Sequence, residues 1–185
     1  KSQQMIEEII RDTFKTDQEW KMAILRVANV GGAFEHGVLG EFVVPLPKNV
    51  LPVLLQVAAQ QRDLIELQRF ANTKDQTVER SFVHVLDVCE AVKSSLHWLN
   101  EQDNILESFD IAGTVASIQE LTQSVEEVTQ SKIHHIDATY KINELEQVAS
   151  TSEKAFKVLN WKAQRSINQM IEDEWRFYQN TLNNR

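Results

Sequence analysis

Apolar residues recur at alternating steps of four and three residues between Val78 and Leu106. The positions that carry this pattern are Val78, Phe82, Val85, Cys89, Val92, Leu96, Leu99 and Leu106. A helix with this spacing has one narrow apolar stripe, which is buried against partner helices along its length. No proline or glycine interrupts the stretch. The pattern therefore predicts one long helix of about 45 Å at the centre of a bundle.

The flanking patterns also predict helices. Residues 1 to about 30 carry apolar faces of helical spacing, with a break near Lys15. A second helical stretch starts at about Lys48 with Pro52 in its first turn, where the missing N–H does little harm. Whether 48–107 is one continuous helix or breaks at 72–76 stays open. Two further helices are expected after Leu106. Asp110 is suited to cap the first of them, and one of residues 150–152 is suited to cap the second.

Glycine and proline concentrate in one stretch, which predicts an irregular connection over residues 31–47. A glycine-rich loop can cradle phosphate, but the Gly-Lys-Ser/Thr ending that such loops need is absent. The connection is longer than most loops between helices, so we expect it to carry a protein-interaction surface. An alternative is that its apolar residues pack over the end of the bundle. These residues are Phe34, Phe42, Val43, Val44 and Leu46.

Composition supports a helical protein. Only 5 glycines and 3 prolines occur among 185 residues, whereas folds built of turns and strands need more of both. The net charge of −8, without a dense basic cluster, excludes a nucleic-acid site and disfavours an anionic membrane surface. The single cysteine, Cys89, excludes an internal disulfide and fits a reducing compartment such as the cytoplasm. No run is apolar enough for a transmembrane helix. Because the sequence starts with Lys1 rather than Met, we expect it to be part of a longer chain.

The residues that most often carry chemistry are not arranged for it. His134 and His135 are adjacent on a predicted helix, so their rings diverge, while His84 and His97 lack the spacing of metal ligands. The acidic runs 126–127 and 172–174 have the character of solvated helix faces. The sequence contains no nucleophile elbow and no pairs of the Glu-x-x-His type. We therefore expect no catalytic, cofactor-binding or metal-binding residues, and no enzyme.

The segments 98–110 and 116–121 are similar to a spectrin repeat. A core tryptophan near the end of one helix, a Leu-x-Ser-x-Asp turn and a Gln-x-Leu opening of the next helix match at Trp98, Leu106, Ser108, Asp110, Gln119 and Leu121. The end of the chain, Trp175-Arg176-Phe177 with Leu182 and Arg185, is similar to the last turns of such repeats. Two departures are Thr122-Gln123, where the family usually has a histidine, and Gly113 near a helix start.

The resemblance and the helical pattern lead to one expectation. The fold is all-α: an elongated antiparallel three-helix bundle over 78–185, preceded by a helical segment, 1–77, that contains the loop 31–47. Its function is that of a non-catalytic spacer and interaction module for a cytoskeletal or signalling partner, and a homodimer is left open. A dimeric membrane-curvature module of the BAR type and a cofactor-binding helical bundle are the alternatives. The predicted core residues are Trp98, Leu99, Leu106, Leu121 and Trp175.

Overall fold

The computed structural model describes residues 2–17, 19–34, 37–42, 47–70, 72–138 and 145–183. It mixes helices and strands along the whole chain, so the predicted all-α fold is wrong. The helices are α1 (Ser2–Phe14), α2 (Val50–Ala58), α3 (Val85–Asn100), α4 (Ile118–Thr129), α5 (Glu153–Leu159) and α6 (Ile167–Asn183). The strands are β1 (Lys21–Val27), β2 (Asn29–Gly31), β3 (Ile65–Leu67), β4 (Glu79–His84), β5 (Ile105–Ile111), β6 (Thr114–Ser117), β7 (His135–Asp137) and β8 (Gln147–Val148). None of the helices in these ranges is long and apolar enough to cross a bilayer.

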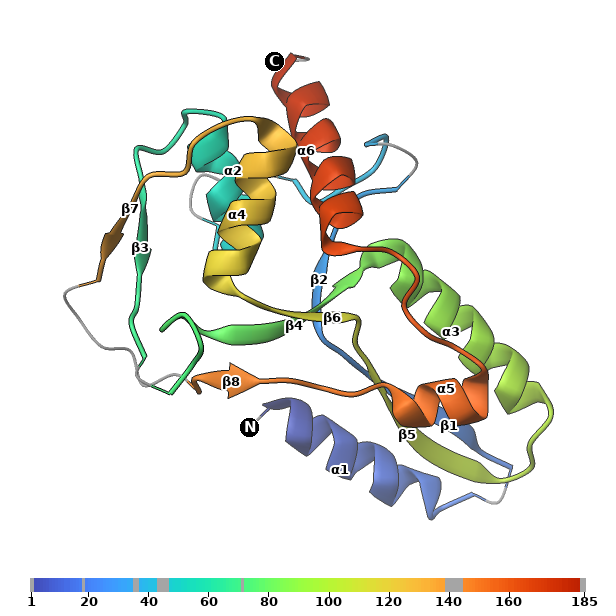
Figure 1. The fold of residues 1–185 in the computed structure, drawn as a ribbon. Coiled ribbons are helices and arrows are strands. Elements are labelled where there is room, and N and C mark those ends of the chain that lie inside the picture. The colour runs from blue at the N-terminus through green and yellow to red at the C-terminus, as the bar shows by residue number, and fades with distance from the viewer. Residues whose placement is uncertain are drawn as a thin grey trace.

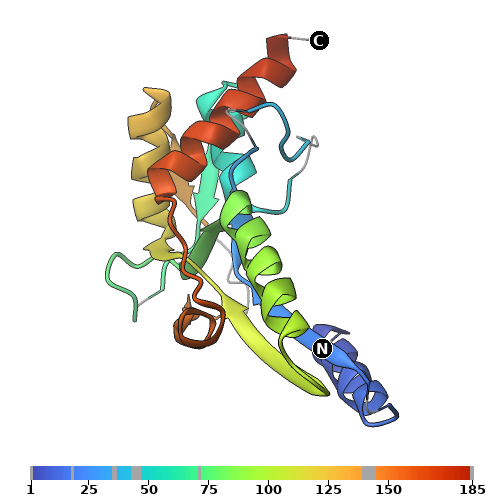
Figure 2. The same cartoon turned by 90° about the vertical axis from the view of Figure 1, so that its right-hand side faces the viewer.

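One end of the molecule is built on the parallel pair β1–β5, with α1, α3 and α5 around it (Figures 1 and 2). Its register runs from Lys21 opposite Ile105 to Val27 opposite Ile111. Parallel strands are normally covered on both faces and occur in larger sheets. Within the described residues β1 pairs only with β5, so its other edge carries no strand.

The middle of the molecule is organised by β4. This strand pairs in parallel with β2 and with β8, and antiparallel with β6. A separate parallel pair, β3–β7, lies beside α2 and α4 (Figure 1). The pairs β1–β5, β2–β4 and β3–β7 all join strands that are distant in sequence, which requires crossover connections rather than hairpins.

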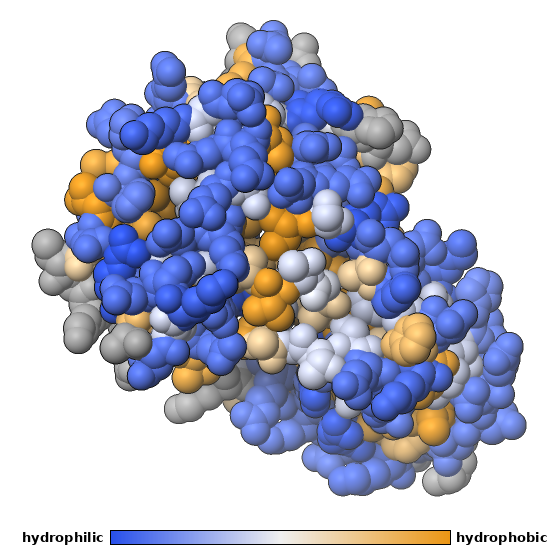
Figure 3. Space-filling view, in the orientation of Figure 1, coloured by the Kyte–Doolittle hydropathy of each residue, from blue (hydrophilic) through white to orange (hydrophobic). Residues whose placement is uncertain are grey.

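Successive residues of β4 serve two different cores, because side chains alternate between the faces of a strand. Phe82 packs with α2, α4 and α6, while Val83 packs with α3, α5 and β5. Both side chains are buried. The two faces of β4 thus connect the two halves of the molecule. In the orientation of Figure 1 the molecular surface is mostly polar, with apolar side chains at its middle (Figure 3).

The predicted central helix is wrong as a single element. The structure divides the stretch from Val78 to Leu106 into β4, α3 and the start of β5. His84 ends the strand and caps α3, because its Nδ1 accepts the N–H of Leu86. Within α3 the helical spacing is real, but Val92 and Leu96 of the stripe are exposed. The helix instead buries Asp87, Ala91 and Ser95.

The predicted three-helix bundle over 78–185 is wrong because strands interrupt the predicted helices. The Leu-x-Ser-x-Asp segment lies in β5, where it alternates between faces instead of turning a helix. The predicted second helix, from Asp110 to Val148, is divided among β5, β6, α4, β7 and β8, and the third is interrupted between α5 and α6. The predicted helix over 1 to about 30 holds only for α1, since β1 follows it.

The structure places the predicted core residues in different settings. Leu121 is fully buried in the core formed with α2 and α6. Trp98 is partly buried and contacts Phe109 edge-on at 5.3 Å, and Trp175 stacks on Tyr178 at 5.8 Å. Leu99 and Leu106 are partly exposed.

Removing the cap of α4 is expected to destabilise the protein. Ser117 accepts the N–H of Glu120, whose carboxylate accepts the N–H of Ser117 in return, which is a complete capping box. Ser117→Ala should therefore lower the free energy of unfolding by about 2 kcal/mol, measured by urea denaturation. Glu120→Gln is the matched control, because glutamine can make the same reciprocal bond. Equal stabilities for the two variants would contradict the role of the cap.

Candidate functional site

A cleft of about 540 Å³ opens where the first residues of β2 and α2 meet β3 and β4. Its walls come from six separate segments of the chain, so it exists only in the folded protein. The lining residues are Asn29, Lys48, Asn49, Val50, Val53, Arg62, Leu64, Ile65, Glu66, Leu67, Gln68, Thr77, Val78, Arg80, Phe82, Ile118 and Ala138. Clefts of this size are typical of small-molecule sites.

The cleft is positively charged although the whole chain is acidic. Among the described residues that line it, Lys48, Arg62 and Arg80 outnumber the one acidic residue, Glu66. Arginine carries a planar fork of donors that matches phosphate oxygens, and lysine adds a point charge. The concentration of basic groups on a protein with a net charge of −8 indicates an anionic ligand.

Arg80 is held more firmly than the other two basic residues. Its backbone lies opposite Ala116 of β6 on one side and opposite Val148 of β8 on the other. Its guanidinium Nη1 also donates to the carbonyl oxygen of Glu79 at 2.8 Å. The β4 strand therefore presents a partly ordered guanidinium to the cleft, whereas Arg62 lies in a connection between α2 and β3.

Two amide side chains link the cleft to a second cavity. Asn29 and Asn49 line the cleft and also a neighbouring cavity of about 640 Å³. Asn29 Nδ2 donates to the carbonyl oxygen of Ser81 at 3.0 Å, which fixes its side chain across β2 and β4. The walls of the second cavity are mainly apolar, with Cys89, Glu41 and Glu174 among them. A ligand that extends beyond the charged cleft can therefore continue past these amides.

A partly buried polar network supports the wall of the cleft that contains Thr77. Thr77 Oγ1 donates to Asp75 Oδ1 at 2.7 Å and accepts the N–H of Gln119 at 3.1 Å, and Ser117 Oγ donates to Asp75 Oδ2. Burial by itself raises the pKa of Asp75, but the hydrogen bonds from Ser117 and Thr77 outweigh it and hold this pKa below its usual value. The ionised carboxylate thus joins the loop before β4 to the start of α4.

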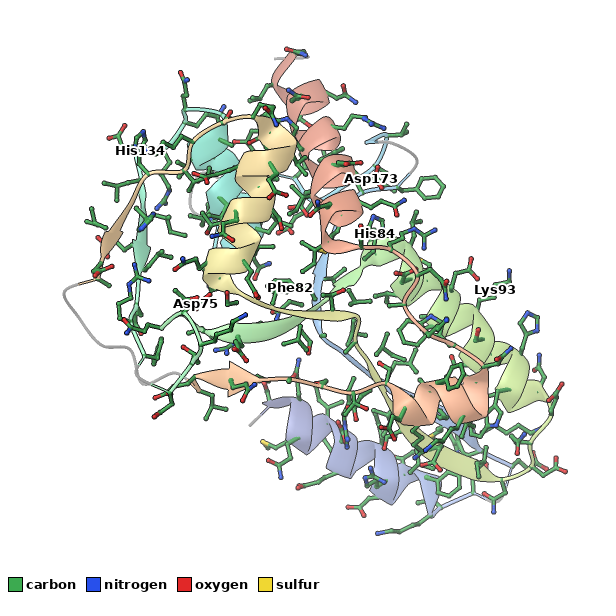
Figure 4. All side chains as sticks on the ribbon, in the orientation of Figure 1. Asp75, Phe82, His84, Lys93, His134 and Asp173 are labelled. Carbon is green, nitrogen blue, oxygen red and sulfur yellow. The ribbon has the colours of Figure 1, made fainter. Side chains whose placement is uncertain are left out.

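A second polar cluster lies where α6 crosses the ends of β2 and β4. His84 and Asp173 meet there, with His84 Nε2 3.3 Å from Asp173 Oδ2 (Figure 4). Because Nδ1 of this histidine accepts the N–H of Leu86, the neutral ring carries its proton on Nε2, toward the carboxylate. Burial lowers the pKa of His84, so the ring is neutral at pH 7. The full burial of this histidine was not predicted.

The residues predicted to form an interaction surface are only partly described. Phe34 lines the second cavity and is 40% exposed. Phe42 is 73% exposed and contacts Phe177 edge-on with ring centroids 6.0 Å apart. Val43, Val44 and Leu46 lie outside the described residues. No finding tests whether this loop binds a protein, so that role stays a prediction.

The residues of the charged cleft were missed by the sequence analysis. Asn29, Lys48, Asn49, Arg62 and Arg80 follow no motif, and only the pairing of β2 and β4 and the start of α2 bring them together. A run of apolar residues before the glycines at 31 and 32 was the available signal, because it fits a buried parallel strand followed by a tight turn. Among the residues that the structure describes, no three His, Cys, Asp or Glu side chains are placed to hold a metal ion.

No family model matches the chain. A curated protein of Cyamopsis tetragonoloba is 33% identical over 175 residues, which cover 92% of this chain and 49% of that protein. One of Bacillus subtilis is 32% identical over 184 residues, which cover 97% of this chain and 53% of that protein. Both are named UDP-glucose 4-epimerase. The chain is thus similar to about half of each of these enzymes.

A solved structure agrees with the sequence relatives. The UDP-glucose 4-epimerase of Stenotrophomonas maltophila, with bound NAD and formylated UDP-arabinopyranose, superposes with a TM-score of 0.90 at 26% identity. The superposition covers 98% of this chain and 54% of that chain. The fold is therefore Rossmann-like α/β, and this chain spans about half the length of the curated epimerases that it matches.

These comparisons correct the functional expectations. Similarity to enzymes over more than nine-tenths of the chain overturns the resemblance to a spectrin repeat, the non-catalytic scaffold and the expectation that the chain is no enzyme. The membrane-curvature module and the helical cofactor bundle are overturned as well, because neither accounts for the parallel strands or for these relatives.

Proposed function

We propose that this chain is the part of a sugar-nucleotide epimerase that binds the nucleoside diphosphate of a UDP-sugar. The single observation that carries the proposal is the basic cleft, in which Lys48, Arg62 and Arg80 gather on an otherwise acidic protein. Support comes from the curated relatives named UDP-glucose 4-epimerase and from the superposed enzyme that binds a UDP-sugar derivative.

The composition of the cleft suits the two parts of a nucleotide. Guanidinium and ammonium groups bind phosphate oxygens through charge-assisted hydrogen bonds. The partly exposed side chains of Val50, Val53 and Ile118 offer apolar surface to a planar base and a ribose. The amides of Asn29 and Asn49, at the passage to the second cavity, are suited to hydroxyl groups of a sugar that extends past the diphosphate.

The sequence lacks the motif that binds a nicotinamide dinucleotide. Dinucleotide sites need a G-x-G-x-x-G turn between a strand and a helix, and this sequence has none. The residues of this chain therefore do not fit the pyrophosphate of NAD, and we derive no hydride transfer from them. In our proposal the cofactor is bound by the half of the relatives' length that this chain does not span.

Three expectations from the sequence stay predictions. A homodimer and a protein partner are untested. A cytoplasmic setting is supported by the single cysteine, Cys89, which the structure places at the surface.

Calorimetric titration with UDP, UMP, uridine and ADP tests the proposal. We expect UDP to bind about tenfold more tightly than UMP, because UMP lacks one phosphate for the basic side chains. Uridine should bind more weakly than either. Equal affinities for UDP and uridine would contradict recognition of the diphosphate, and equal affinities for UDP and ADP would contradict recognition of the base.

A further inference from the structure

Helix α6 turns two adjacent acidic side chains into the protein. Asp173 reaches His84 at the end of β4, and Glu174 Oε2 accepts the N–H of Gly32 at 2.8 Å, just after β2. The two strand ends are neighbours, since Gly31 lies opposite His84 in the parallel register. One turn of α6 therefore holds the carboxyl ends of both strands, and both acids are more than nine-tenths buried.

The backbone after β2 passes through a space that admits no side chain. A Cβ on Gly31 would lie 2.9 Å from Met170 Sδ and 3.2 Å from Glu174 Oε2. Gly32 has φ of +88°, and a Cβ there would collide with the imidazole of His84. Because the segment is enclosed on both sides, its position depends on the groups that touch it. Asn29, three residues earlier, lines the basic cleft and the second cavity.

We propose that Glu174 is a positioning residue for the nucleotide site. By accepting the N–H of Gly32 it fixes the Asn29–Gly32 segment at the junction of the two cavities, and its ionisation loosens that segment, so that affinity for the nucleotide falls as pH rises. The inference rests on the proposed function, since it assigns the cleft to a UDP-containing ligand. Glu174 contacts the segment and not the cleft itself, so it acts through Asn29.

The surroundings of Glu174 favour its neutral form. Burial raises the pKa of Glu174 to about 7; the N–H of Gly32 opposes this rise, and the carboxylate of Glu41 adds to it. The neutral acid keeps a carbonyl oxygen that accepts the N–H of Gly32. The carboxylate accepts this N–H more strongly than the neutral acid does, but its burial costs more, so ionisation above pH 7 favours a loosened segment that admits water to the charge. The titratable groups that border the same cavities or the same segment are Glu41, Cys89, Tyr178, His84 and Asp173.

The affinity for UDP at pH 6 and pH 8 tests the proposal. Glu174→Gln keeps a neutral acceptor at every pH, so wild-type affinity should fall about fivefold relative to this variant between the two conditions. The terminal phosphate of UDP itself titrates at about pH 6. That titration affects both proteins equally, so it cancels in the ratio of their affinities. The control is Glu172→Gln, an exposed acid two positions earlier on α6, which should follow the wild type.

A ratio that stays constant between pH 6 and pH 8, with UDP still bound, overturns the role of Glu174 and leaves the proposed function standing. Absence of UDP binding by the wild type overturns both. Glu41→Gln is a second variant at an exposed position. It removes a neighbouring negative charge and should shift the pH transition of the wild type to lower pH. An unchanged transition in that variant also contradicts the proposal.

Thermal unfolding tests the same carboxyl without any ligand. The pKa of Glu174 is raised from its ordinary value of 4.5 to about 7 on folding, so the folded state binds more protons between these values. Stability contributed by this group is therefore lost as pH rises through that window. The difference in melting temperature between Glu174→Gln and the wild type should change by about 5 °C in favour of the variant from pH 5 to pH 8. A constant difference would contradict the ionisation.

Discussion

Replacing Arg80 with glutamine is expected to weaken UDP binding by about 10- to 100-fold. The backbone of Arg80 pairs with β6 and β8 and its guanidinium already donates to the carbonyl oxygen of Glu79, so less conformational freedom is lost when it binds a phosphate. Arg62 lies outside regular structure and must be ordered on binding, so Arg62→Gln should cost less, about fivefold. Calorimetry at constant ionic strength measures both, because salt screens such contacts.

Arg11→Gln is the control for these two variants. Arg11 is exposed on α1 and is not part of the cleft, so the variant removes the same charge without changing the site. If all three variants weaken binding equally, the effect is one of overall charge. In that case the cleft does not hold the diphosphate through Arg80 and Arg62.

Replacing Asp87 with alanine is expected to lower the free energy of unfolding by about 3–5 kcal/mol. Its carboxylate pairs with Arg165 Nη1 at 2.5 Å and accepts the N–H groups of Gln164 and Arg165 at 3.1 and 3.0 Å. The carbonyl oxygen of Asp87 also accepts Trp161 Nε1–H at 2.9 Å. The variant leaves the guanidinium of Arg165 and the two backbone N–H groups without the carboxylate, and water cannot easily replace it because Asp87 is 1% exposed.

Urea denaturation followed by circular dichroism measures this loss. Asp12→Ala is the matched control, since Asp12 is 76% exposed and its ion pair with Lys15 lies at the surface. That change should stay within about 0.5 kcal/mol. A loss below about 1 kcal/mol for Asp87→Ala would show that water replaces the missing carboxylate.

Local signals identified some elements correctly. The helical pattern near the N-terminus corresponds to α1, and Pro52 lies in the first turn of α2 as expected. These features depend on neighbours within a few residues. The helical spacing of α3 was also visible, but the pattern could not show that Asp87, Ala91 and Ser95 form its buried face.

The strands could not be identified in the same way. Met22-Ala23-Ile24-Leu25 is a continuous apolar run, as expected for a parallel strand, and does not alternate as a half-buried strand would. Such a run fits a helix equally well until its partner is known, and the partner of β1 is β5, far along the chain. The basic cleft was hidden for a related reason, because Lys48, Arg62 and Arg80 converge only through these long-range pairings.

The edge of β1 that faces away from β5 is a place where another strand can pair. In the part of the chain that the structure describes, no strand pairs with this edge, and an extended segment of another molecule can add to the main-chain donors and acceptors of such an edge. Basic side chains on an edge strand often prevent such pairing. In β1, however, Lys21 forms an ion pair with Asp103 at 3.5 Å and Arg26 forms one with Glu7 at 2.7 Å. Both basic side chains are thus engaged within the molecule. If such a segment adds to the molecule, we expect it to pair with this edge of β1.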